Sequence, residues 1–299
     1  MPWYDLFMNR SVTSKKKDAI AFDFDGTLIR GGKLNNDKSI HIMYSTWTAC
    51  KEYGFDRFLH PENLAIDTSR MLRAYIRYPG SPRFQQLSAL VNALVNQKYE
   101  SISAFEELGV PENLRSSYES VKTCYNDRYS ALNDAAAKKH WLPWPSTKNT
   151  LTLLSHTFDL YIASGVTQDI LIEDFTRHTF SQDLFKGIYG GDPSGKNDKA
   201  EILSHILAQG YQRVLFVADS NKDREYAMQA GAFFFRIKED ADFIHLSAIV
   251  KNKQWPTGKP WTFTSQELHF MEQSTLHLLT QYCAGTILTP LEISNYINQ

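Results

Sequence analysis

The stretch Ala19–Leu28, which reads AIAFDFDGTL, decides the fold. Its first four residues form a continuous apolar run, which is typical of a strand buried on both faces in a parallel sheet. Similar apolar runs follow at 160–163, 214–217 and 233–235, and helical patterns separate these three runs from one another. Strands that alternate with helices predict the α/β class, with a Rossmann-like, doubly wound parallel sheet as the core.

A long stretch of different character lies between the first apolar run and the later ones. From 31 to 144 apolar residues recur mostly at helical spacing, on one face at Phe84, Leu87, Leu90, Val91 and Leu94 and on another at Tyr118, Val121, Tyr125 and Leu132. We expect residues 31–144 to form a helical cap that is inserted into an α/β core made of 18–30 and 145–240.

Two further segments flank these parts. Residues 241–299 contain two patterns that start helices, namely Thr264 with Glu267 and Thr289-Pro290 with Glu292. We expect them to form a helical C-terminal extension that packs on the core. Residues 1–17 are expected to be an N-terminal tail, because their apolar stretch precedes three lysines, the reverse of the order in a secretory signal.

The composition bounds the partners and the compartment. The 299 residues include 32 Lys and Arg against 33 Asp and Glu, so no global basic excess points to a nucleic acid. No apolar run approaches the roughly 20 residues needed to cross a bilayer. The three cysteines are widely spaced and match neither a disulfide framework nor a metal-ligand pattern. We expect a cytoplasmic protein with no membrane or nucleic-acid partner; the sequence does not indicate its oligomeric state.

The first candidate site residues follow the first strand directly. Asp23 and Asp25 are separated by one residue, so both side chains can point the same way from an extended segment. Gly26 allows the backbone to turn sharply after them. Ligands of open α/β sheets bind at the carboxyl ends of the strands, where this pair lies. Taken alone, the pair is also compatible with a loop that carries two solvated aspartates.

A second pair of carboxylates follows the apolar run at 214–217. Asp219 and Asp223 are four residues apart, so a strand-end loop and the first turn of a helix can direct both toward one ion. Hard oxygen ligands of this kind suit Mg²⁺. The alternative is an ordinary capped helix start with polar residues.

Two further segments carry residues that can bind an anion. Ser164 and Gly165 follow the run at 160–163, where a hydroxyl and free backbone N–H groups at a helix start form an anion site. Lys196 and Lys199 lie near the start of the next helical pattern, where either can neutralise a phosphate and a carboxylate. Each segment, taken alone, is also typical of a capped turn or of solvated surface lysines.

The order of these four elements resembles that of the haloacid dehalogenase superfamily, in its phosphatase branch with a helical cap between the first two motifs. The resemblance covers about 18–29 and 145–237. The first motif is matched by Asp23-x-Asp25-Gly26-Thr27, the second by Ser164, the third by a lysine and the fourth by Asp219 with Asp223.

The sequence departs from the pattern of the superfamily at two points. Ala218 stands where a glycine is common in the fourth motif. The third motif fits two lysines, and we favour Lys199, which opens a Lys-Ala-Glu-Ile-Leu pattern, over Lys196, which follows Pro193 by three residues.

The resemblance implies a mechanism and a cofactor. Asp23 would be the nucleophile that forms an aspartyl-phosphate, and Asp25 the general acid and base. Asp23, the backbone carbonyl of Asp25 and Asp219 would hold Mg²⁺, and Asp223 would support its ligands or waters. The phosphoryl group would be bound by Thr27, Ser164, Gly165 and the lysine.

These features predict a Mg²⁺-dependent phosphoric monoester hydrolase that acts on a small phosphorylated metabolite. By the resemblance, an acid at Asp25 distinguishes phosphatases from dehalogenases, and a cap closes over the site and selects the substrate. A phosphotransferase or phosphomutase needs the same two aspartates and stays open. A binding module without catalysis on this fold is the third possibility.

One cap residue is a candidate for contact with the substrate. Arg83 follows the Pro- and Gly-containing loop 77–82, and a guanidinium suits bidentate contact with phosphate or carboxylate. We expect Arg83 to reach the leaving group of the substrate. The alternative is a solvated helix start.

Overall fold

β1 (Asp18–Phe22) is the central strand of a parallel sheet with the order β5-β4-β1-β6-β7. The computed structural model describes residues 18–32, 35–78, 81, 83–97, 112–191, 199–252, 254–286 and 288–299. Within these residues the other strands of the sheet are β4 (Asp159–Thr167), β5 (Phe185–Gly191), β6 (Arg213–Ala218) and β7 (Phe233–Arg236). The α/β class and the parallel sheet predicted from the sequence are confirmed.

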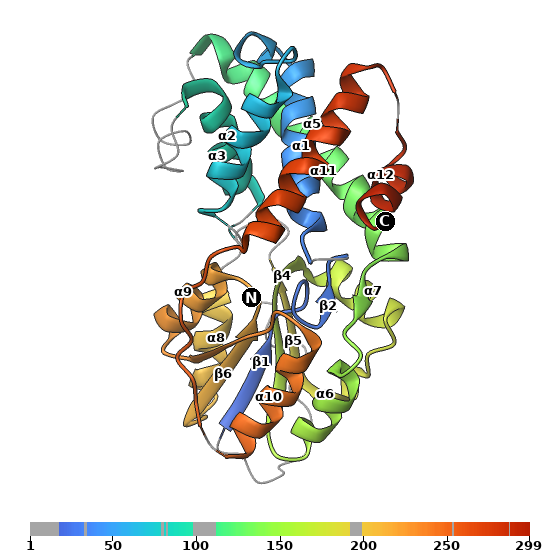
Figure 1. The fold of residues 1–299 in the computed structure, drawn as a ribbon. Coiled ribbons are helices and arrows are strands. Elements are labelled where there is room, and N and C mark those ends of the chain that lie inside the picture. The colour runs from blue at the N-terminus through green and yellow to red at the C-terminus, as the bar shows by residue number, and fades with distance from the viewer. Residues whose placement is uncertain are drawn as a thin grey trace. The chain divides into compact units, whose positions relative to one another are not determined.

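Helices cover both faces of this sheet (Figure 1). One face carries α6 (Thr147–Ser155), α7 (Gln168–Arg177) and α10 (Asp240–Lys251), and the other carries α8 (Lys199–Ala208) and α9 (Asn221–Ala230). A short 3-10 helix, η3 (Gln182–Leu184), precedes β5. Ala19–Phe22 are fully buried, as their apolar run predicts for a strand covered on both sides.

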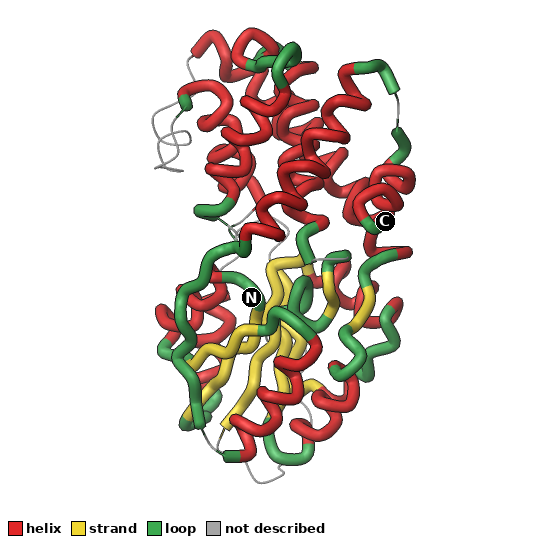
Figure 2. The backbone as a smooth tube through the Cα atoms, viewed as in Figure 1, coloured by secondary structure: helices red, strands yellow, loops and turns green. Residues whose placement is uncertain are grey.

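The chain divides into two compact units, the α/β unit at 1–29 and 143–260 and a helical unit at 30–142 and 261–299. The strands of the large sheet all belong to the first unit, and the second is built from helices (Figure 2). The chain crosses between the units three times, and β2 (Ile29–Arg30) and β3 (Leu142–Pro143) pair at two of these crossings.

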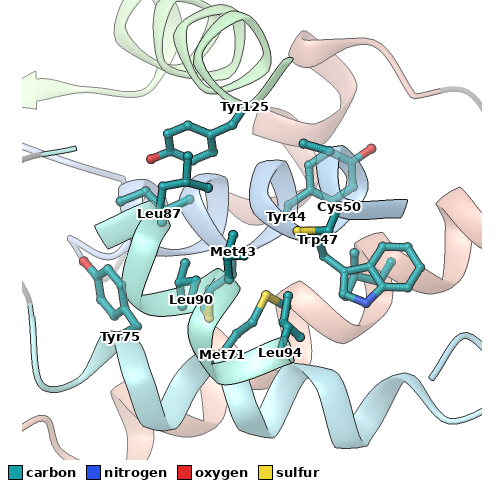
Figure 3. Packing of buried hydrophobic residues seen from close by; sticks show 14 of the residues in the cluster. Met43, Tyr44, Trp47, Cys50, Met71, Tyr75, Leu87, Leu90, Leu94 and Tyr125 are labelled. Atoms are coloured by element: carbon teal, nitrogen blue, oxygen red, sulfur yellow. The ribbon is translucent and has the colours of Figure 1, made fainter. Parts of the chain in front are cut away.

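The helical unit is arranged around α1 (Asp37–Glu52), most of whose residues are buried. The elements that pack with it are η2 (Asp56–Phe58), α2 (Leu64–Tyr75), α3 (Arg83–Asn96) and α5 (Glu112–Lys139). Figure 3 shows Trp47 and Met43 of α1 among buried side chains of α2, α3 and α5. The apolar faces predicted within 31–144 are buried, except for Phe84, which is 37% exposed.

The predicted C-terminal extension, 241–299, divides between the two units. The helices start where their capping patterns predict, as α11 (Ser265–Cys283) after Thr264 and α12 (Pro290–Ile297) after Thr289. Residues 261–299, which include both helices, belong to the helical unit. Their apolar stripes share its core, through Met271, Leu278, Leu279, Ile293 and Ile297. The segment 241–260, including most of α10, stays with the α/β unit.

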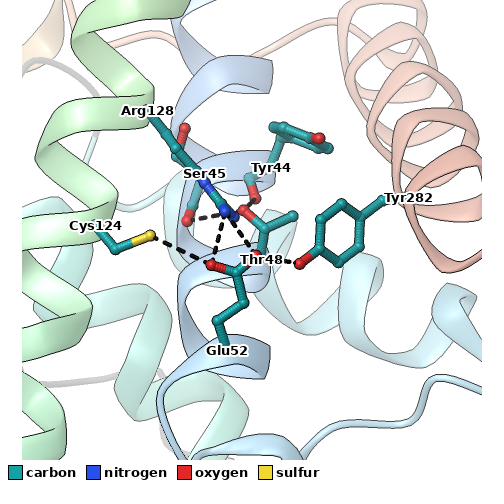
Figure 4. A network of polar contacts seen from close by, with 7 residues as sticks. All are labelled: Tyr44, Ser45, Thr48, Glu52, Cys124, Arg128 and Tyr282. Atoms are coloured by element: carbon teal, nitrogen blue, oxygen red, sulfur yellow. Dashed lines mark hydrogen bonds and ion pairs between the residues drawn. The ribbon is translucent and has the colours of Figure 1, made fainter. Parts of the chain in front are cut away.

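Polar contacts also fix the extension to the helical unit. The Tyr282 hydroxyl of α11 donates to Glu52 of α1, and Arg128 of α5 donates to both oxygens of the same carboxylate at 2.6 and 2.7 Å (Figure 4). At the other end of α1, Asn298 Nδ2 donates to Asp37 Oδ2 at 3.0 Å. Both ends of α1 are therefore bonded to the extension.

Candidate active site

The loop after β1 is shaped by backbone hydrogen bonds that bring Asp23 to the edge of the sheet. The N–H of Asp23 donates to Val217 O at 2.9 Å and extends the pairing of β1 with β6 by one residue. The Asp23 side chain is 5% exposed. The chain then turns back, because the N–H of Gly26 donates to Ile29 O at 2.7 Å. Asp25 lies in this turn and is half-buried.

Gly26 lies directly against the fourth motif. It has φ +80°, in the left-handed region that glycine adopts without strain. A Cβ atom at this position would lie 2.5 Å from Asp219 Oδ2, which is closer than such atoms approach. The absence of a side chain at Gly26 therefore lets the Asp219 carboxylate lie beside the turn that follows Asp23.

Asp223 is held in place by Ser220, the N-cap residue of α9. The Ser220 Oγ accepts a hydrogen bond from the Asp223 N–H at 3.1 Å and donates to Asp223 Oδ2 at 2.5 Å. Asp223 is 1% exposed. The sequence reasoning gave Ser220 no role, although a serine three residues before an acid at a helix start is the signal of such a cap.

Lys199 is the first residue of α8 and joins the two carboxylate pairs. Its side chain is buried, and Nζ lies 3.0 Å from Asp23 Oδ1 and 2.6 Å from Asp223 Oδ1. The structure thus brings the predicted Lys199 into the site. Lys196 lies outside the described residues, as does the predicted tail at 1–17.

Among the described residues, the carboxylates of Asp23, Asp219 and Asp223 lie together with one ammonium, that of Lys199. Burial, the largest effect, raises the pKa of Asp23 to about 8; Lys199 opposes this rise, and the carboxylates of Asp223 and Asp219 add to it. For Lys199 burial acts to lower the pKa, but Asp223 and Asp23 outweigh it and hold the pKa above its ordinary value. The site therefore favours an added cation.

The donor set fits a divalent metal ion. Asp23, Asp219 and Asp223 each offer a carboxylate oxygen, and these atoms lie within 4.8 Å of one another. Oxygen ligands from one or more carboxylates are what Mg²⁺ takes in proteins, together with waters and substrate phosphate. Of the four predicted metal residues, the side chains of these three converge. Binding of the metal by the backbone carbonyl of Asp25 stays a prediction.

Ser164 follows Ala163, the last residue of β4 in regular register with β5, and β4 is the strand next to β1. Phe22 of β1 pairs with Ile162, so Asp23 and Ser164 follow the paired ends of neighbouring strands. Ser164 is buried, and its Oγ accepts a hydrogen bond from the Val166 N–H at 3.2 Å. Gly165 is exposed. The backbone at Gly165 is therefore open to a ligand at this edge.

Thr27 is fully buried in the loop after β1. Its Oγ1 has no hydrogen-bond partner among the residues that the structure describes. A buried hydroxyl of this kind costs free energy unless it finds a partner, which is consistent with a polar group of a ligand or a water at this point.

Arg83 belongs to the helical unit, where it is the first residue of α3. Its Nη1 donates to Asn126 Oδ1 at 2.6 Å, and its guanidinium lies 4.8 Å from the centre of the Tyr129 ring. These contacts orient the side chain along α5. The predicted contact of Arg83 with a substrate stays a prediction.

The chain was compared with protein families, with curated proteins and with solved structures. No model of a protein family matches the chain, and no curated protein matches it. None of the described helices is long and apolar enough to span a membrane.

Several solved structures are similar to this one. A haloacid dehalogenase-like hydrolase from Streptococcus pneumoniae has 21% identity and a TM-score of 0.42, with 76% of this chain and 89% of that chain covered. A structure described as a predicted phosphoglycolate phosphatase from Haemophilus somnus has 19% identity and a TM-score of 0.47, covering 81% and 100%. Protein tyrosine kinase A of Mycobacterium tuberculosis has 20% identity and a TM-score of 0.44, covering 87% and 99%.

These three structures are described as a hydrolase, a phosphatase and a kinase, and their sequence identity to the chain is low.

Proposed function

We propose that the chain is a Mg²⁺-dependent phosphatase of the haloacid dehalogenase type, which hydrolyses a small phosphorylated metabolite through an aspartyl-phosphate on Asp23. One observation carries the proposal. Asp23 lies at a strand end in contact with Lys199, and its carboxylate has oxygen atoms of Asp219 and Asp223 within 4.8 Å, a set that could hold a cation.

Asp23 is suited to attack phosphorus. The Lys199 ammonium contacts Asp23 Oδ1 at 3.0 Å, which fixes the rotation of the carboxylate and offsets part of its charge. A bound Mg²⁺ would be held by Asp23, Asp219 and Asp223 and would neutralise negative charge on the phosphate and the carboxylates. A carboxylate oxygen of Asp23 forms a bond to phosphorus while the bond from phosphorus to the leaving oxygen breaks.

Asp25 supplies and removes the protons of the two half-reactions. It protonates the leaving oxygen of the substrate in the first step. In the second step it takes a proton from a water, which attacks the phosphorus of the aspartyl-phosphate, releases phosphate and restores the Asp23 carboxylate. The backbone at Gly165 and the Ser164 hydroxyl would bind phosphoryl oxygens, where negative charge is greatest in the transition state.

The proposal is tested with an aryl phosphate and Mg²⁺. We expect turnover that is lost in Asp23→Asn and after removal of the metal by EDTA. Asp134→Asn is the matched control, because Asp134 is an exposed carboxylate on α5 that pairs only with surface Lys138 among its described ion pairs. No turnover of the aryl phosphate or of a broad panel of phosphorylated metabolites would contradict the proposal.

Arg83 is the candidate for contact with the leaving group in this proposal. The exposed side chain at the start of α3 suits an anionic group of a substrate. We expect Arg83→Ala to lower kcat/KM for substrates with a negatively charged leaving group more than for an aryl phosphate whose leaving group is uncharged. Arg115→Ala, at another exposed arginine of the helical unit, is the control. A kcat/KM in Arg83→Ala that equals the wild-type value for every accepted substrate would refute this role.

A further inference from the structure

The two strands β4 and β5 lose their regular register at the candidate site. Ala163 pairs with Tyr189, and the next pair along the ladder is Thr167 with Gly191. β4 therefore spends four residues where β5 spends two, so that Ser164–Val166 bulge out of the ladder. A bulge re-aims backbone and side chains, and such bulges are common beside active sites.

The side chain of Gln168 bridges the strands across this bulge. Its Oε1 accepts a hydrogen bond from the Gly190 N–H at 2.6 Å, and its Nε2 donates to Ile188 O at 3.1 Å. Both backbone groups flank Tyr189, the last residue of β5 in regular register. The carboxamide thus bonds β5 beside the bulge, at the point where the regular pairing with β4 is interrupted.

Gly190 shows how closely β5 approaches the bulge. A Cβ atom at this position would lie 2.7 Å from the Cα and N of Gln168 and 2.8 Å from Val166 O. These neighbours are backbone atoms that cannot move aside, so only glycine fits. The contact and the two hydrogen bonds fix the backbone after Ser164 against the end of β5.

The side-chain hydrogen bonds of Gln168 go to β5 and not to its own helix. It is the first residue of α7, and Thr167 is the N-cap residue. The Gln168 carboxamide is directed to β5, and both its donor and its acceptor are engaged there. These two hydrogen bonds connect the start of α7 to β5, and a role within the helix alone does not account for them.

We propose that Gln168 is a positioning residue that holds the bulge Ser164–Val166 in the shape that binds a phosphoryl group. The inference rests on the proposed function, because it assigns phosphoryl oxygens to Ser164 and the backbone at Gly165. Donors that stabilise a transition state must be held close to their productive positions, and a displacement of about 1 Å can cost about 100-fold in rate. Gln168 supplies the restraint that the interrupted ladder lacks.

The test compares Gln168→Ala and Gln168→Glu with the wild-type chain. Gln168→Ala removes both bonds, whereas the acid in Gln168→Glu can still accept from Gly190 and loses the donor to Ile188. We expect kcat for an aryl phosphate to fall about 10- to 100-fold in Gln168→Ala, with KM changed less than about 3-fold. Gln168→Glu should fall between the two. Gln182→Ala, at an exposed glutamine of η3, should match the wild type.

Two further readouts separate the inference from a general loss of structure. Hydrogen exchange in Gln168→Ala should accelerate at 164–167 and 188–191 and stay unchanged in β1 and β6. Orthovanadate, a mimic of the transition state, should bind Gln168→Ala about 10-fold more weakly by calorimetry in the presence of Mg²⁺.

The outcomes also separate this inference from the proposed function. If the wild type turns over the aryl phosphate and Gln168→Ala keeps its kcat and its exchange at 164–167, the role of Gln168 is refuted alone. If the wild type shows no turnover but binds orthovanadate, and Gln168→Ala weakens that binding, the phosphatase proposal fails and the positioning role stands. If the wild type neither turns over the aryl phosphate nor binds orthovanadate, both are refuted.

Discussion

At the scale of single residues, the site depends on contacts made by side chains that do no chemistry themselves. Ser220 is the clearest case. It caps α9 and at the same time hydrogen-bonds the Asp223 carboxylate, which faces Lys199. Removing a residue that orients a metal ligand typically lowers metal affinity about 10- to 100-fold.

Ser220→Ala should therefore weaken Mg²⁺ binding about 10- to 100-fold, because Asp223 loses the hydroxyl that orients it. It should also lower the free energy of unfolding by about 1 kcal/mol through the lost cap. Calorimetric titration with Mg²⁺ measures the first effect. Thr264→Ala is the matched control, since Thr264 accepts from the Glu267 N–H at 3.2 Å in the helical unit. Equal loss of Mg²⁺ affinity in both variants would refute the role of Ser220.

Two glycines with positive φ separate backbone strain from local crowding. Gly26→Ala should abolish most activity, because a Cβ there would meet Asp219 Oδ2 at 2.5 Å. Gly231 has φ +74° and no atom within 4 Å of the same position, so Gly231→Ala brings strain alone. We expect Gly231→Ala to lose about 1–2 kcal/mol of stability, Gly26→Ala to lose more because the clash adds to the strain, and only Gly26→Ala to lose turnover. Full activity in Gly26→Ala would contradict the described turn.

At the scale of elements, the sequence predicted which residues follow the ends of strands better than it predicted the register between the strands. Apolar runs that end in Asp23, Ser164 and Asp219 predict strand ends, and parallel strands bring such ends to one edge. The contacts of Lys199 could be predicted only as one of two alternatives, because helix starts vary by a residue or two. The bulge in β4 and the bridge by Gln168 had no signal, since register depends on the neighbouring strand.

The helix α1 carries a buried histidine that makes the helical unit sensitive to pH. His41 is fully buried and its Nδ1 lies 2.7 Å from Asn133 Oδ1, while Nε2 has no partner among the described residues. Burial lowers the pKa of His41 from 6.5 to about 4, despite the hydrogen bond with Asn133. Between these two values the unfolded chain binds a proton that the folded unit does not, so stability is full above pH 6.5 and falls as the pH falls toward 4.

Urea unfolding of the helical unit should therefore lose about 2 kcal/mol between pH 6.5 and pH 5 through His41. Burial raises the pKa of Asp37 to about 6, which acts in the opposite direction over part of this window, so the comparison with a variant is needed. His41→Gln should remove the loss, and His269→Gln, at an exposed position of α11, should keep it. Hydrogen exchange of the backbone amides of α1 reports the stability of the helical unit at each pH. Identical pH profiles for wild type and His41→Gln would contradict the account.

At the scale of the whole molecule, the extension at 261–299 shows what a sequence pattern leaves undecided. Capping patterns and apolar spacing predicted both helices and their starting residues. They did not indicate which partner the apolar stripes would cover, because an amphipathic helix fits any apolar surface of matching shape. The stripes of α11 and α12 complete the core around α1.

Leu278→Ala tests this assignment of the extension. Leu278 is 1% exposed in the core of the helical unit, so its truncation should cost that unit about 2–5 kcal/mol. Hydrogen exchange should accelerate in α1 and α5 and remain unchanged in β1 and β4. Leu291→Ala, at a residue of α12 that is 46% exposed, is the control. Acceleration confined to the strands would instead support an extension packed on the α/β core.

The central claim is that Asp23 carries the phosphoryl group during turnover. The most direct measurement is mass spectrometry of Asp25→Asn after rapid quenching with 4-nitrophenyl phosphate and Mg²⁺. This substrate has a good leaving group and needs little acid, whereas the second step lacks its base, so the intermediate should accumulate. We predict one phosphoryl group on the peptide that contains Asp23, removable by hydroxylamine and absent when Asp23→Asn is added. Turnover that persists in Asp23→Asn, with no phosphorylated peptide in Asp25→Asn, would contradict the account.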